Sequence, residues 1–227
     1  MTHLLLLHGA IGAQDQFAPL EEKLQRRFIV HSLNFSGHGG APHYGDFSIA
    51  GFAGDVLRYL SANDIATIDI FGYSMGGYVA LYLAKHHPEK VGKVFTLATK
   101  FDWSPEIAAR EIKMLDADKI AEKIPAFAKL LEMRHRSSDW KVVLKKTADM
   151  MVAMGSDNPL RLDDFQNIGH NVRIGIGDRD AMVTFDETLA VYRALPNADF
   201  IVLPDTPHPL EKVSLDRLAH EIETFFS

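Results

Sequence analysis

The chain has 227 residues, of which 47% are hydrophobic, so it can bury one sizeable core and we expect a single domain over residues 1–227. It contains no cysteine, which excludes disulfides, thiolate catalysis and cysteine-ligated metals and suits a reducing compartment, so we predict a cytoplasmic protein. A net charge of -6 without a basic tract argues against nucleic-acid binding, and no apolar stretch approaches the length that spans a bilayer, so we expect no membrane partner.

Predicted strands and helices alternate along most of the chain. Apolar, β-branched runs indicate strands, and the amphipathic stretches between them indicate helices. The expected strands span residues 3–7, 28–34, 65–71, 93–98, 172–176 and 199–203, and the expected helices span residues 14–26, 48–62, 75–87, 184–195 and 209–226. This alternation predicts an α/β fold with a mostly parallel, doubly wound sheet.

The first predicted strand ends in His8-Gly9, and a glycine-bearing loop follows it. A backbone N–H in such a loop can stabilise a negatively charged oxygen, and Ala10 is the expected donor. For the His8 side chain we favour a structural role, in which the imidazole supports the loop by hydrogen bonds. His38 lies in a second glycine-rich loop, after the second strand, and we favour a structural role for it as well.

The segment after the third predicted strand reads G-Y-S-M-G at residues 72–76. A turn from a strand directly into a helix is the setting that presents a nucleophilic serine, here Ser74. The turn forces its central residue into an unusual backbone conformation, and glycine two positions to either side avoids a collision with neighbouring backbone. The helix that begins there offers unpaired N–H groups, of which that of Met75 is the natural oxyanion donor.

The stretch from about residue 101 to residue 164 is helical and charged, and it interrupts the alternation. Methionine side chains are flexible and polarizable, so a surface rich in them can accept varied apolar groups. The large apolar side chains here include Trp103, Met114, Phe127, Met133, Trp140, Met150, Met151 and Met154. We expect most of them to form a small helical core and only a few to line a pocket.

An acid and then a histidine follow the last two predicted strands. Asp178 and Asp180 come directly after strand 172–176, and either could reach a histidine. Among the 11 histidines, only His208 follows a late strand and opens a predicted helix. The chain order serine, aspartate, histidine is that of one known catalytic triad arrangement.

These segments together resemble the α/β-hydrolase superfamily over nearly the whole chain. The resemblance rests on the His8-Gly9 loop, the Ser74 turn, the acid loop at residues 177–180 and the His208 loop. The loop at residues 34–39 is similar to the family's D-x-x-G-H-G loop, with asparagine in place of aspartate.

The resemblance implies a core trimmed at its N-terminus, without two strands that many members carry. It also implies that Asp180, which has the family's spacing from Gly177, is the acid rather than Asp178. Residues 101–164, called the cap segment below, stand where the family inserts a helical cap over the active site.

For function, the resemblance implies a serine hydrolase that cleaves a small carboxylic ester or a related acyl substrate through a Ser74, His208 and Asp180 triad and an acyl-enzyme. Aspartate replaces this serine in members that open epoxides or displace halide. The turn also resembles that of menaquinone-pathway lyases, which usually carry arginine where Tyr78 stands. A C–C bond hydrolase or lyase, or a small-molecule receptor with slow turnover, therefore stays as an alternative.

We expect no cofactor, no metal and a small-molecule substrate as the partner. The partial G-x-G at residues 175–177 lacks the third glycine and the following helix of a dinucleotide-binding loop. No spacing of histidine, aspartate and glutamate strongly resembles a metal site.

Overall fold

A six-stranded parallel sheet forms the centre of the computed structural model, which describes residues 1–43, 45–136 and 138–227. Its strands are β1 (Thr2–Leu7), β2 (Phe28–Ser32), β3 (Ile68–Tyr73), β4 (Val91–Leu97), β5 (Val172–Gly177) and β6 (Ala198–Leu203). The strand order is β2-β1-β3-β4-β5-β6, and every neighbouring pair is parallel. The predicted α/β fold class is confirmed.

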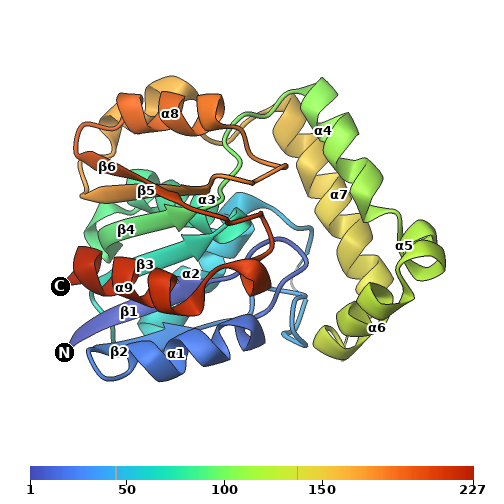
Figure 1. The fold of residues 1–227 in the computed structure, drawn as a ribbon, viewed down its shortest axis with the longest axis horizontal. Helices are drawn as coiled ribbons and strands as arrows, with labels where there is room; N and C mark the ends of the chain where they lie inside the picture. The colour runs from blue at the N-terminus through green and yellow to red at the C-terminus, as the bar shows by residue number, and fades with distance from the viewer. Residues whose placement is uncertain (44, 137) are drawn as a thin grey trace.

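Helices cover both faces of this sheet (Figure 1). One face packs against α2 (Ile49–Ala62), α3 (Met75–His86) and α8 (Phe185–Ala194), and the other against α1 (Ala18–Leu24) and α9 (Leu215–Phe226). Strand β1 illustrates the cause, because Leu5 and Leu7 enter the first core while Leu4 and Leu6 enter the second. A central strand covered on both faces has to be apolar on both, which explains its uninterrupted run of leucines.

The remaining helices connect these layers or belong to the cap segment. The short 3-10 helices are η1 (Gln14–Phe17), η2 (Pro88–Lys90), η3 (Ile112–Leu115), η4 (Leu162–Asn167) and η5 (Leu210–Lys212). The helices of the cap segment are α4 (Pro105–Glu111), α5 (Ala117–Lys123), α6 (Pro125–Arg134) and α7 (Trp140–Ser156). Within the described ranges, none of the helices is both long and apolar enough to cross a membrane.

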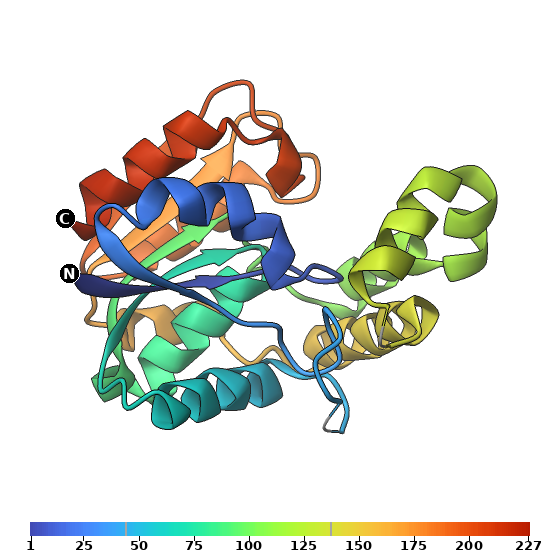
Figure 2. The ribbon, with the colours of Figure 1, turned by 90° about the horizontal axis from the view of Figure 1, so that it is seen from below.

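The cap helices lie together beyond the edge of the sheet where the strands end, apart from the two helical layers (Figure 2). They enclose a small core of their own, in which Ile120, Leu131 and Leu144 are buried. Proline at the first position of α4 and of α6 suits a helix start, since the N–H that it lacks would have no partner there.

Several predicted elements differ from the observed ones: the helix expected at 14–26 is the 3-10 helix η1 followed by α1, and the strand expected at 28–34 ends at Ser32. The strand expected at 65–71 begins only at Ile68, because the Ile65 N–H still bonds to the Leu60 carbonyl at the end of α2. The helix expected at 209–226 is interrupted, because Val213 and Ser214 have extended backbone between η5 and α9. His208 therefore precedes a single 3-10 turn rather than a long helix.

Candidate active site

Ser74 lies in the turn between β3 and α3, with a φ of 52° and a ψ of -118°. Positive φ is rare for a residue other than glycine, and such strain is typical of a turn that presents a nucleophile. The Ser74 N–H donates to the Leu97 carbonyl at 2.8 Å, and the Thr99 hydroxyl donates to the Ser74 carbonyl at 3.0 Å. Position 76 needs glycine because a Cβ there would collide with the Leu7 carbonyl.

The structure brings His208 and Asp180 into contact, with 2.8 Å between His208 Nδ1 and Asp180 Oδ2. The other oxygen of Asp180 accepts the N–H groups of Met182 at 2.8 Å and Val183 at 2.9 Å. Burial opposes the charge of this carboxyl, but the hydrogen bonds outweigh burial and lower the pKa of Asp180. A charged carboxylate at Nδ1 keeps the proton on that nitrogen and leaves Nε2 free to act as a base.

Asp178 has a different role in the same loops. Its Oδ1 accepts the Thr206 N–H at 3.0 Å, two residues before His208. Hydrogen bonds from the N–H groups of Thr206 and Asp205 lower the pKa of Asp178. Asp178 thus ties the acid loop to the histidine loop, whereas Asp180 contacts the histidine itself.

The two expected oxyanion donors, Ala10 and Met75, line the same cavity as Ser74 and His208. Met75 is the first residue of α3, so its N–H lies at a helix N-terminus, where the amides lack partners within the helix. The cavity therefore has the serine, the histidine and both candidate donors on its wall.

His8, which precedes the loop that carries Ala10, is fully buried. Its Nδ1 lies 2.8 Å from the Gly9 carbonyl, and its Nε2 accepts the Phe35 N–H at 3.2 Å. Burial lowers the pKa of His8 to about 3, so the imidazole is neutral and Nδ1 carries the proton. His38 is buried as well, with Nδ1 at 3.2 Å from the Ser36 carbonyl. Both histidines make supporting contacts of the kind that a structural role requires.

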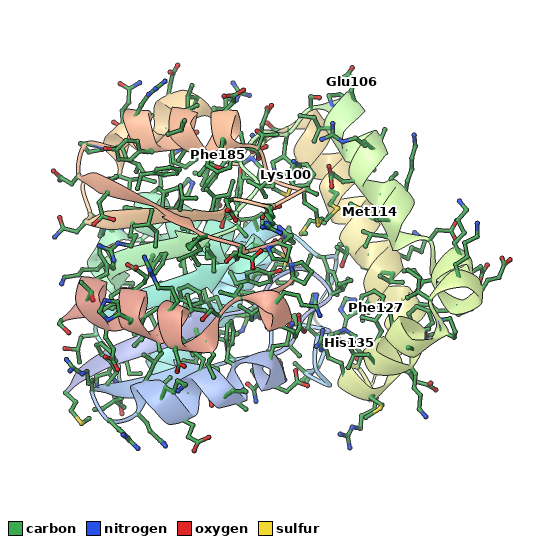
Figure 3. All side chains as sticks on the ribbon, viewed as in Figure 1. Lys100, Glu106, Met114, Phe127, His135 and Phe185 are labelled. Carbon is green, nitrogen blue, oxygen red and sulfur yellow. The ribbon has the colours of Figure 1, made fainter. Side chains whose placement is uncertain are left out.

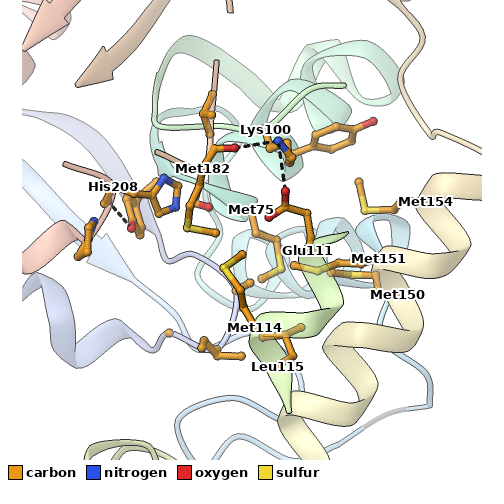
Figure 4. A pocket seen from close by; sticks show the side chains of 18 of the residues that line it. Met75, Lys100, Glu111, Met114, Leu115, Met150, Met151, Met154, Met182 and His208 are labelled. Atoms are coloured by element: carbon orange, nitrogen blue, oxygen red, sulfur yellow. Dashed lines mark hydrogen bonds and ion pairs between the residues drawn. The ribbon is translucent and has the colours of Figure 1, made fainter. Parts of the chain in front are cut away.

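The cavity has a volume of about 310 Å³ and lies between the sheet edge and the cap segment. Its wall is mostly apolar, and methionines from core and cap surround it (Figure 4). The lining methionines are Met75, Met114, Met150, Met151, Met154 and Met182.

The expectation that only a few large apolar side chains of the cap segment line the pocket was wrong. Six of the eight do so, namely Trp103, Met114, Phe127, Met150, Met151 and Met154. Trp140 packs in the small cap core, and Met133 is exposed. One reason is the packing of α7 against α4 and η3, which places Met150, Met151 and Met154 of α7 and Met114 of η3 beside the cavity.

Lys100 is one of two cationic side chains on the cavity wall, and it is already paired. Its Nζ donates to the Met182 carbonyl at 2.8 Å and lies 3.8 Å from Glu111 and 3.6 Å from Glu187 (Figure 4). All three charged side chains are at least 89% buried. One ammonium therefore faces two carboxylates, and it connects the cap helix α4 to the acid loop.

Arg134 is the second cation, at the end of α6. Its Nη2 donates to Glu211 at 3.2 Å, and its Nε lies 3.7 Å from Asp15. Glu211 also accepts the Gln16 side-chain N–H at 2.8 Å and belongs to η5, next to His208. Both cations of the cavity wall are thus matched by carboxylates, which leaves little positive charge for an anionic ligand.

Tyr78 is buried at the base of the cap segment. Its hydroxyl bonds to Asn158 Oδ1 and accepts the Leu160 N–H at 2.9 Å, while the Asn158 side-chain N–H donates to the Phe101 carbonyl at 3.2 Å. Burial raises the pKa of Tyr78 well above its usual value, so the phenol stays neutral. Tyr78 therefore joins the two ends of the cap segment.

Lys100, Arg134 and Tyr78 are site residues that the motifs did not indicate in these roles. Lys100 had a signal, since it comes three residues after β4, at the sheet edge where the candidate catalytic loops gather. The other two had none, because their partners come from distant segments. In the part of the chain that the structure describes, no three His, Asp or Glu side chains are arranged to hold a metal ion.

Comparison with known proteins gives a consistent result. A family model described as alpha/beta hydrolase fold matches residues 2–130. Over 86 residues the chain is 38% identical to a pimeloyl-(acyl-carrier protein) methyl ester esterase of Neisseria meningitidis serogroup B, a stretch that covers 38% of this chain and 32% of that protein. The chain thus matches about a third of the length of these curated relatives.

Solved structures resemble the chain over its whole length. A thermophilic esterase from Thermogutta terrifontis has a TM-score of 0.80 at 20% identity, covering 100% of this chain and 89% of that one. An enol-lactonase from Burkholderia xenovorans has a TM-score of 0.80 at 19% identity, covering 99% of this chain and 91% of that one. At this level of identity, the similarity establishes the fold.

Proposed function

The chain belongs to the α/β hydrolase family, and from that premise we propose that it is a serine hydrolase that cleaves a small carboxylic ester or a related acyl substrate through an acyl-enzyme. The observation that carries this proposal is the 2.8 Å contact between His208 Nδ1 and Asp180 Oδ2 on a cavity that Ser74 also lines. The similarity to a methyl ester esterase over 86 residues supports ester hydrolysis.

In the proposed mechanism, Ser74 Oγ attacks the acyl carbonyl while His208 Nε2 accepts the hydroxyl proton. Asp180 holds the imidazole in the required tautomer and stabilises its positive charge. The N–H groups of Ala10 and Met75 bind the oxyanion, each contributing a factor of about 10²–10³ in kcat. His208 then protonates the leaving alcohol. In the second half of the reaction, water attacks the acyl-enzyme while His208 accepts its proton, and His208 returns that proton to Ser74 Oγ as the acid leaves.

The cavity wall favours an uncharged substrate with an apolar acyl or alcohol part. Its methionines and aromatic side chains offer apolar contact, and its flexible thioethers adapt to varied shapes. Lys100 and Arg134 each face two carboxylates, so a substrate carboxylate would compete with partners already in place. We therefore propose neutral esters as the substrate class, and a cytoplasmic location for the cysteine-free chain.

This charge distribution disfavours the lyase alternative, which needs a cation for an anionic substrate. At the position of the lyase arginine, the Tyr78 hydroxyl is occupied with the ends of the cap segment. A receptor with slow turnover differs from the esterase in rate, so the first experiment has to measure reaction at the serine.

The experiment is labelling with a fluorophosphonate probe, followed by mass mapping of the adduct. We expect labelling at Ser74 that disappears in Ser74→Ala and falls strongly in His208→Ala. p-Nitrophenyl esters of increasing acyl length then report turnover. A folded wild-type protein that neither reacts with the probe nor hydrolyses any of these esters would refute the proposed function.

A further inference from the structure

The loop that carries Ala10 is a tight turn. The Gly12 N–H donates to the Gly9 carbonyl at 3.1 Å, which closes the turn around Ala10 and Ile11. Ile11 has a φ of 53°, a left-handed conformation that residues other than glycine rarely adopt. Such a backbone persists only when surrounding contacts hold it, so the groups that bind this turn matter for the donor.

His8 holds the first half of the turn. Its Nδ1–H donates to the Gly9 carbonyl at 2.8 Å. The peptide unit between Gly9 and Ala10 is planar and trans, so its C=O and N–H point in opposite directions. A fixed Gly9 carbonyl therefore fixes the direction of the Ala10 N–H, the proposed oxyanion donor.

His135 holds the second half, and it comes from the cap segment. It is fully buried at the end of α6, between that helix and the loops of the core (Figure 3). Its Nε2 lies 3.0 Å from the Ile11 carbonyl, and its Nδ1 lies 3.0 Å from the Gly39 nitrogen. Because the Gly39 N–H can only donate, Nδ1 has to accept and Nε2–H has to donate to Ile11.

The neutral imidazole suits both contacts. Burial lowers the pKa of His135, and the neighbouring Arg134 charge acts in the same direction. Both ring nitrogens are occupied with backbone, so His135 has no free nitrogen to exchange protons with a substrate. Its chemistry is that of a fixed donor and acceptor between two loops.

We propose that His135 is a positioning residue for the reaction: it holds the Ile11 carbonyl so that the Ala10 N–H stays directed at the substrate oxygen. This inference rests on the proposed function, because it assigns a task within that active site. Since His135 ends a cap helix, the oxyanion hole is fully assembled only when the cap segment is in place over it.

The test compares His135→Ala with His135→Gln, which keeps one donor and one acceptor, and with Lys146→Gln as a matched control. Lys146 also links the cap to the core, through Gly45 and Asp46, but it touches neither the turn nor the cavity wall. The readouts are kcat and KM for a neutral p-nitrophenyl ester, and amide hydrogen exchange of the segment at residues 8–13, with circular dichroism to check folding.

For His135→Ala we expect kcat to fall about 10- to 100-fold with KM changed less than about threefold, since small displacements of a catalytic group cost up to about 10²-fold. Exchange of the Gly12 amide should become faster. His135→Gln should recover most of both effects, and Lys146→Gln should show neither.

Three results would overturn the inference: unchanged kcat and exchange in a folded His135 variant, an equal loss of kcat in Lys146→Gln, or no recovery by glutamine. If the wild-type protein neither reacts with fluorophosphonate nor hydrolyses any p-nitrophenyl ester, the proposed function fails by itself. The exchange measurement would then still decide whether His135 holds the turn.

Discussion

Replacing Asp180 by asparagine tests the core of the proposed mechanism. The asparagine oxygen can still accept the N–H groups of Met182 and Val183, so the loop should keep its shape. Its NH₂ group, however, would face His208 Nδ1 in place of the carboxylate oxygen that lies 2.8 Å away. His208 Nδ1 would then accept a hydrogen bond from the amide, and the proton of the ring would lie on Nε2. This tautomer cannot act as a base at Nε2.

We expect this tautomer change to lower kcat by about 10⁴-fold, as in other serine triads, which equals about 5.5 kcal/mol of lost transition-state stabilisation. The assay is kcat for a p-nitrophenyl ester together with the fluorophosphonate labelling rate. KM should change little, because Asp180 does not line the cavity.

Asp178→Asn is the matched control, since it lies two residues away and also accepts a backbone N–H, from Thr206. Its asparagine oxygen can keep that bond, and we expect kcat within about threefold of the wild type. An Asp180→Asn variant that keeps more than a tenth of wild-type kcat, or an equal loss in Asp178→Asn, would refute the assignment of the acid.

Three further predictions concern pH, the cap and charge. Folding lowers the pKa of His8 from 6.5 to about 3, so the unfolded chain binds more protons between these values, and His8 contributes a loss of stability of about 1.4 kcal/mol per pH unit as pH falls below 6.5. Burial lowers the pKa of His38 and His135 in the same direction, so urea unfolding at pH 7 and pH 5 should show a loss of at least this size. Tyr78→Phe removes the hydroxyl that bonds to Asn158 and is the nearer of the two acceptors of the Leu160 N–H, so it should cost about 1 kcal/mol in urea unfolding and raise KM. Glu111→Gln removes one of the two carboxylates beside Lys100, so it should raise kcat/KM for half-esters of dicarboxylic acids relative to neutral esters; unchanged selectivity would contradict that reasoning.

Local sequence patterns predicted the sheet and indicated the candidate catalytic loops, because both depend on neighbours in the chain. The G-Y-S-M-G turn is one example: the clash that demands glycine at position 76 arises within a single strand-turn-helix unit and the strand beside it. Likewise, the apolar run of β1 follows from its coverage on both faces. Such rules need no knowledge of distant partners.

The contacts around the cavity depend on partners far away in sequence. His135 is 124 residues from Ile11, and Tyr78 is 82 residues from Leu160, so no local pattern marks either residue. The predicted start of the helix at 209–226 was wrong for a similar reason, whereas its end at Phe226 is confirmed. The composition there is compatible with a helix, but extended backbone at Val213 interrupts it and separates Leu210, which packs with the second core, from α9.

Three polar contacts connect the cap segment to the three loops that carry the proposed catalytic groups. Lys100 pairs with Glu111 of α4 and holds the acid loop through a backbone carbonyl, Arg134 of α6 pairs with Glu211 beside the histidine, and His135 holds the turn that carries the oxyanion donor. A shift of a cap attached in this way would disturb the groups that we propose carry out the reaction. A substrate too large for the cavity would have to displace the cap, which would loosen the loops that carry the proposed transition-state contacts. We therefore expect such a substrate to have a lower kcat as well as a higher KM.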